Sequence, residues 1–176
     1  MANTYVLIAS NTLGSNTASV TFSSIPNTYT DLVVKTSTRL PSSGGYFENL
    51  FVELNANTGA VYSGTLLRGN GGTTGSARQS TGNGYFEYFY TNDSSTTSNT
   101  FSNCELYIPN YTASTNKPIS SFSVVENNSA TAAESFIATT AHLFGSTSAI
   151  TSIKFYYSGG NIASGSSFFL YGIKNS

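Results

Sequence analysis

Hydrophobic and polar residues alternate along most of this chain with a period of two, the period of a β-strand with one dry and one wet face. The apolar runs are short, rich in β-branched and aromatic residues, and bounded by Gly, Pro, Asn and Ser, which predicts strands separated by turns. No stretch of useful length shows the helical period. The predicted strands are 5–8, 18–22, 32–39, 46–54, 61–67, 85–90, 101–108, 119–126, 135–142, 150–157 and 168–173.

The alternation also predicts which face of each strand is buried. Strand 32–39 sets apolar and threonine positions against lysine, serine and arginine, so one face is dry and the other is wet. The same reasoning applies to the strands that follow, because successive side chains point to opposite faces of a sheet. The residues expected to face the core are Leu32, Val34, Thr36, Thr38, Leu50, Val52, Leu54, Cys104, Leu106, Ile108, Phe122 and Val124.

Three hairpins are expected from the turn residues. Runs 153–157 and 168–173 flank a loop of Gly, Ser and Asn and predict a C-terminal hairpin, whose last strand closes the fold. A similar opening hairpin would join 5–8 to 18–22. Residues Asn55–Gly59 predict a tight connection between their flanking strands, since Asn and Gly tolerate positive φ.

Many short strands at regular spacing, with turns between them, are typical of an all-β sandwich or barrel. A two-sheet antiparallel β-sandwich of the jelly-roll type fits the length best. An immunoglobulin-like sandwich fits less well, because it would use fewer residues and this chain has no tryptophan for its core. A propeller or β-helix would show an internal repeat, which is not found. We expect one domain over residues 1–176.

Two long polar segments, 68–83 and 91–100, flank the aromatic strand 85–90. Loops longer than about a dozen residues in a compact domain commonly carry function, so both segments are expected to contact another molecule. Tyrosine, asparagine, serine and glycine build adaptable polar contacts to sugars or proteins, but they are also ordinary strand and turn formers. The residues predicted to contact a partner are Arg68, Asn70, Arg78, Asn83, Tyr85, Asn92, Asp93 and Asn99.

The composition of the chain narrows the range of partners that it could bind. Only 9% of the 176 residues are charged and the formal net charge is −1, whereas nucleic acids and anionic membranes select clustered basic residues. The seven lysines and arginines are scattered along the chain, so neither partner is expected. The first residues lack the basic start and the apolar run of a secretory signal, which predicts folding in a cytoplasm.

The sequence carries no recognisable catalytic or cofactor motif. The single Cys104 and the single His142 could form a reactive pair, but a small buried cysteine is the simpler interpretation. A glycosidase needs two carboxylates in one cleft, and Glu87 with Glu105 is one conceivable pair that sequence spacing cannot establish. No His, Asp and Glu cluster has metal-ligand spacing. We therefore expect a non-enzymatic protein without metal or cofactor.

Several segments resemble a family of small virion structural proteins of tailed bacteriophages, notably cyanophages and other marine phages. These segments are Ala18–Val33, Leu106–Tyr111 and Gly160–Ile173, and the likeness spans nearly the whole chain except 69–83. The resemblance implies a jelly-roll-like β-sandwich on a capsid or tail appendage, commonly trimeric, with localisation in the virion after assembly in the host cytoplasm. The motifs that carry the resemblance are strand and turn segments, so it implies no catalytic residues for this chain.

Two functions follow as expectations. The first is a capsid decoration or cement protein that binds the outer capsid surface, with the major capsid protein as partner and a homotrimer as oligomeric state. The second is a tail-fibre or tail-tip receptor-binding module, in which polar loop residues would bind a cell-surface glycan. A glycan-degrading enzyme is a third, weaker hypothesis, because no acid/base pair is recognisable.

Overall fold

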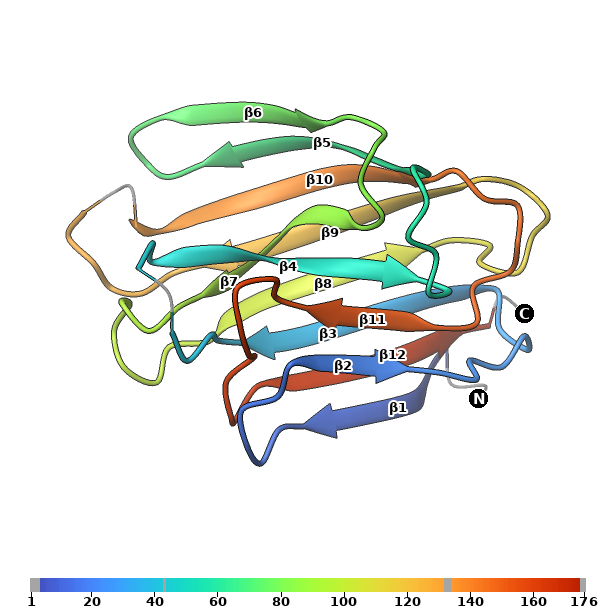
Figure 1. Cartoon of the computed structure of the whole chain (residues 1–176), viewed down its shortest axis with the longest axis horizontal. Coiled ribbons are helices and arrows are strands. Elements are labelled where there is room, and N and C mark those ends of the chain that lie inside the picture. The colour runs from blue at the N-terminus through green and yellow to red at the C-terminus, as the bar shows by residue number, and fades with distance from the viewer. Residues whose placement is uncertain (1–3, 43, 132–133, 175–176) are drawn as a thin grey trace.

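The chain folds into two facing antiparallel β-sheets (Figure 1), which confirms the predicted all-β sandwich. The computed structural model describes residues 4–42, 44–131 and 134–174. The larger sheet has the spatial order β1 (Tyr5–Thr12), β12 (Ser167–Ile173), β3 (Asp31–Thr38), β8 (Ser102–Ile108), β9 (Lys117–Val125), β10 (Phe136–Phe144), β5 (Tyr62–Gly69) and β6 (Thr74–Gln79). The smaller sheet has the order β2 (Ser19–Phe22), β11 (Ile153–Tyr156), β4 (Phe47–Leu54) and β7 (Phe86–Asn92).

Strands far apart in sequence pair with one another in a nested order. The first strand pairs with the last, β1 with β12, and the series continues with β2 and β11, β3 and β8, and β4 and β7. Successive strands β1 to β4 therefore alternate between the two sheets. The two remaining pairs, β5–β6 and β9–β10, extend only the larger sheet.

The expected hairpins at the two ends of the chain are wrong. β11 pairs with β2 and β4, whereas β12 pairs with β1 and β3 in the opposite sheet. Phe155 and Phe168, expected to lie in neighbouring strands, instead face each other across the core with ring centroids 5.3 Å apart. Two runs with one apolar face each can bury those faces across a sandwich as well as within one sheet, so the pattern alone could not decide.

The tight hairpin expected at Asn55–Gly59 is also wrong, because β4 and β5 belong to different sheets. Asn55 has a positive φ of 57°, as the sequence suggested, but its side chain binds the loop that precedes β11. Its Oδ1 accepts hydrogen bonds from the backbone N–H groups of Thr151 and Ser152. Asn55 therefore stabilises the connection that crosses from β4 in one sheet to β5 in the other.

Half of the polar segment 68–83 is strand rather than loop. β5 continues to Gly69, Asn70–Thr73 turn, and β6 pairs with β5 in register from Gly64↔Gln79 to Gly69↔Thr74. Figure 1 shows this hairpin at the top, beyond the edge of the smaller sheet. We call β5, β6 and β10 the overhang. Glycine and alanine, which β6 contains at Gly75 and Ala77, have weak strand propensity, so pairing with β5 is what makes this stretch extended.

The main core lies between the sheets, and most predicted inward residues are buried there. Leu50, Val52 and Leu54 of β4 are confirmed on the core face, as are the inward positions of β3 and β8. In β9 the prediction is wrong, because Phe122 faces outward and is 47% exposed, while Ser121 and Ser123 are buried.

The inward serines of β9 have a specific cause. β7, an edge strand of the smaller sheet, lies with its backbone directly on the larger sheet. Ser123 Oγ accepts a hydrogen bond from Tyr90 N at 3.3 Å, and Cys104 Sγ donates to Tyr90 O at 2.9 Å. Ser102 Oγ accepts from Asn92 N in the same way. These side chains pair the backbone groups of a sheet edge, which a purely apolar face could not do.

Candidate functional site

The outer face of the larger sheet carries a group of exposed apolar side chains, which we call the outer apolar patch. It consists of Leu67 (57% exposed), Ile137 (56%), Phe122 (47%) and Leu143 (39%) on strands β5, β10 and β9. Thr139 pairs with Leu67 on one side and with Phe122 on the other, so the three side chains form one row across the sheet.

A groove of about 210 Å³ follows this row between Leu67, Phe122 and Ile137. The neighbouring strands supply a polar margin, with the exposed ion pair of Lys35 and Glu105 at 3.1 Å. An apolar centre within a polar rim on a rigid sheet is the usual anatomy of a protein interface.

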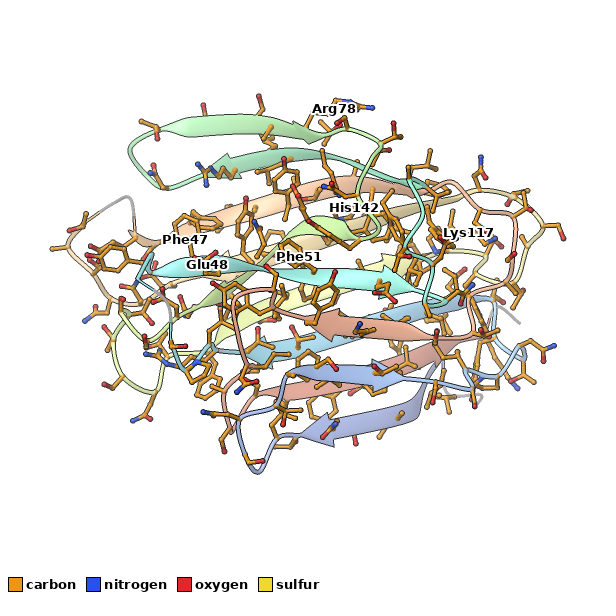
Figure 2. The ribbon with its side chains drawn as sticks, viewed as in Figure 1. Phe47, Glu48, Phe51, Arg78, Lys117 and His142 are labelled. Carbon is orange, nitrogen blue, oxygen red and sulfur yellow. The ribbon has the colours of Figure 1, made fainter. Side chains whose placement is uncertain are left out.

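The inner face of the overhang forms a second feature, the β5–β6 cleft. It has a volume of about 300 Å³ and is lined by Phe47, Arg68, Asn70, Thr73, Thr74, Gly75 and Phe136. The Phe47 ring contacts the Phe136 ring edge-to-face, with centroids 4.5 Å apart. Figure 2 shows Phe47 at the start of β4, beside the overhang. The cleft exists because the smaller sheet ends at β7 and leaves the turn end of β5 and β6 uncovered, whereas Leu66 and Gln79 farther along the same face are buried.

Arg68 provides the positive charge in the cleft. Its guanidinium lies 5.7 Å from the centre of the Phe136 ring and also interacts with the Tyr90 hydroxyl. Burial raises the pKa of Tyr90 to about 12, and the neighbouring charge of Arg68 opposes that shift. Neither of the ion pairs in the described part of the chain, Lys35–Glu105 and Lys154–Glu53, involves Arg68.

The β5–β6 turn gives the cleft an ordered polar wall. Asn70 Oδ1 accepts hydrogen bonds from Gly72 N, Thr73 N and Thr73 Oγ1 at 3.1, 2.7 and 3.2 Å. The side chain closes its own turn, as asparagine commonly does. Its Nδ2 group is left as a hydrogen-bond donor on a fixed frame.

The residues predicted to contact a partner do not share one surface. Arg68 and Asn70 line the β5–β6 cleft. Arg78 lies on the outer face, where its guanidinium donates to Thr65 Oγ1 at 2.9 Å. Asn83 Nδ2 donates to Glu87 Oε1 at 2.9 Å.

The other four predicted residues lie elsewhere. Tyr85 packs beside Phe51, with ring centroids 4.3 Å apart. Asn99 is exposed with a positive φ of 62°. Asn92 and Asp93 are fully buried, so we no longer expect them to contact a partner. Asp93 instead accepts hydrogen bonds from Gly45 N and Ser95 N, which makes it a loop-ordering residue.

The predicted loop after β7 is ordered by a residue that the sequence did not single out. Arg39 donates from its guanidinium to Thr96 Oγ1 and to the carbonyl groups of Thr96, Thr97 and Thr100. One arginine thus binds one hydroxyl and three backbone carbonyl groups of the loop. The loop is therefore an ordered part of the fold.

The groups considered for catalysis are separated or inert. Burial raises the pKa of the Cys104 thiol to about 12, which disfavours a nucleophilic thiolate. His142 Nε2 lies 3.0 Å from Ser121 Oγ rather than beside Cys104. Glu105 pairs with Lys35 on the outer face, while its neighbour Cys104 points inward to Tyr90 on β7. Glu105 therefore points away from β7, the strand that carries Glu87.

The described residues contain no group of three or more His, Cys, Asp or Glu side chains placed to hold a metal ion. They also include no helix with the length and apolarity needed to cross a bilayer. Comparison with protein-family models, with curated proteins and with solved structures finds no match to this chain.

Sequence reasoning predicted Arg68 and Asn70 as contact residues but missed the apolar residues of both features. Phe47 and Phe136 were not among the residues predicted to face the core or a partner. Leu67, Phe122 and Ile137 could be recognised as a patch only from the register of β5, β9 and β10. One signal was available: β9 reads equally well with Ile119, Ser121 and Ser123 inward, which would have turned Phe122 outward.

Proposed function

We propose that this chain is a non-enzymatic structural protein of a tailed-phage virion that decorates the capsid. It would bind the major capsid protein through the outer apolar patch. The observation that carries the proposal is the exposure of Leu67 and Phe122 in one row across the outer sheet face, with Ile137 two residues along β10 from that row. The resemblance of several strand and turn segments to virion proteins supports the location.

We also infer that the sandwich is a jelly roll. Its support is the nested pairing of β1 with β12, β2 with β11, β3 with β8 and β4 with β7. A long hairpin of strands rolled up around a core produces this order, and it gives two Greek keys. On this interpretation β5–β6 and β9–β10 are additions to one sheet, and together they create the surface of the outer apolar patch.

The proposed location is tested by the protein content of purified virions. A decoration protein follows the icosahedral symmetry of the capsid, so we expect hundreds of copies per particle. A tail protein would be present in a few tens of copies or fewer, and that result would reject the decoration role. Absence from virions would reject both.

The proposed docking face is tested by charge substitution. Leu67→Asp and Ile137→Asp are each expected to weaken binding to capsids that lack this protein by at least about tenfold, because a buried carboxylate loses its hydration. Cosedimentation with such capsids measures the effect. Leu7→Asp is the matched control, since Leu7 is 52% exposed on the outer face of β1, outside the patch. Equal binding by Ile137→Asp and Leu7→Asp would contradict the proposed face.

A homotrimer remains part of the proposal. The large sheet ends at β6, whose outer edge has no strand partner among the described residues and carries Arg78 as its one charged side chain. Such an edge can pair with another chain. Light scattering coupled to size-exclusion chromatography would reject the trimer by showing a stable monomer.

The second candidate function is glycan binding on a tail appendage, and the β5–β6 cleft is the observation that favours it. It combines aromatic rings with an arginine, an asparagine amide and threonine hydroxyls, which is the mixture that recognises sugars. A low copy number on virions would make this candidate the preferred one.

A further inference from the structure

Arg68 and Asn70 offer hydrogen-bond donors to the β5–β6 cleft, while the hydroxyl groups of Thr73 and Thr74 can both donate and accept. The Oδ1 atom of Asn70 is already occupied by Gly72 N, Thr73 N and Thr73 Oγ1, so only its amide Nδ2 remains for a ligand. The guanidinium of Arg68 carries donors alone. A ligand that satisfies Arg68 and Asn70 must therefore bring acceptor oxygens.

Arg68 forms no ion pair in the described part of the chain, so the cleft carries a positive charge. Arg68 is exposed and contacts the Phe136 ring and the Tyr90 hydroxyl, and none of the described residues that line the cleft is acidic. A guanidinium recognises a carboxylate through two parallel N–H···O hydrogen bonds, which a neutral sugar hydroxyl cannot offer. The charge therefore favours a carboxylate-bearing ligand.

The remaining wall is apolar. Phe47 is half-buried, and its edge-to-face contact with Phe136 leaves ring surface at the cleft. Sugar rings present C–H faces that pack on such surface. A volume of about 300 Å³ lies at the small end of ligand sites, which fits one sugar ring.

We propose that the β5–β6 cleft binds the carboxylate-bearing pyranose unit of an acidic glycan, with Arg68 on the carboxylate, Asn70 Nδ2 on a ring or hydroxyl oxygen, and Phe47 against the ring face. This inference rests on glycan binding, the second candidate function, and names the site and the sugar class. Virion copy number tests the location of the protein, and sugar binding tests the cleft. Either hypothesis can therefore be rejected without the other.

The test uses methyl glucuronide and methyl glucoside, which differ only in a carboxylate against a hydroxymethyl group. We expect the wild-type protein to bind the glucuronide at least about tenfold more tightly in an NMR titration. Shifts should concentrate on the backbone amides of β5 and the β5–β6 turn. Equal affinity for the two sugars, or no binding of the glucuronide at about 50 mM, would overturn the proposal.

Arg68→Gln should weaken glucuronide binding by about tenfold and leave glucoside binding unchanged. Arg78→Gln is the matched control, because it removes the same charge from the adjacent strand but on the outer face. Asn70→Asp is a second variant that keeps the Oδ1 acceptor of the turn and replaces the donor by an anion. It should weaken binding of the glucuronide more than binding of the glucoside. An equal loss in Arg68→Gln and Arg78→Gln would show a general charge effect and reject the site.

Discussion

Replacing Lys117 by methionine is expected to lower the free energy of unfolding by about 3 to 5 kcal/mol, the range found when a buried charged network loses one partner. Lys117 opens β9 and is only 1% exposed. Its Nζ donates to the carbonyl oxygens of Ala113, Thr115, Ser146 and Ser148 at 2.7 to 3.2 Å. Methionine has a similar length but no donor, so these carbonyl groups would be left without their partner.

The network explains why an ammonium group is tolerated in the interior. Burial lowers the pKa of Lys117, because desolvation disfavours the charged form. Four backbone carbonyl dipoles oppose this penalty, and they come from the two loops before β9 and after β10, which meet at the right-hand end of the sandwich (Figure 2). One side chain thus joins the two loops that flank the terminal pair of the β9–β10 ladder, Lys117 with Phe144.

Chemical denaturation measures the effect, with Lys35→Met as the matched control. Lys35 makes an exposed ion pair with Glu105, and both side chains are about half in solvent. Pairs of this kind contribute about 0 to 1 kcal/mol. Equal stability of the two variants would mean that the carbonyl groups around Lys117 bind water or other donors instead. The Lys117 network would then not stabilise the fold.

The alternation of the chain was enough to predict the fold class and most buried faces. Leu50, Val52 and Leu54 follow the period of two because their strand packs on the core with one face. It could not predict pairing, since the same apolar face is buried by a neighbour in the sheet or by a strand across the sandwich. The pairing of β12 with β1 and β3 depends on contacts more than a hundred residues apart along the chain.

The candidate site was predictable only in part, for a related reason. Arg68 and Asn70 were found because polar residues and glycine cluster around them. Phe47 and Phe136 complete the cleft, but they come from β4 and β10 and meet only after folding. Asp93 was assigned to a contact loop because it lies in the long polar segment 91–100, whereas the backbone N–H groups of Gly45 and Ser95 hold it inside.

His142 is the other buried ionisable group with a large expected effect, and it acts through pH. It lies between the sheets, with its ring 4.6 Å from that of Phe86 and its Nε2 atom 3.0 Å from Ser121 Oγ (Figure 2). Its Nδ1 atom has no hydrogen-bond partner in the described part of the chain. Burial in these surroundings lowers the pKa of His142 to about 4.

The protein is therefore expected to lose about 3 kcal/mol of stability between pH 7 and pH 4 through His142. The unfolded chain binds a proton at this histidine below about pH 6.5, while the folded chain resists protonation until about pH 4, so unfolding takes up a proton in that window. Denaturation curves at several pH values measure the slope. Because His142 is the only histidine, His142→Gln should flatten the slope between pH 7 and pH 5. Burial raises the pKa of Glu87, which acts with the opposite sign and persists in both proteins. An unchanged slope in His142→Gln would show that the imidazole is protonated in the folded chain or reaches solvent.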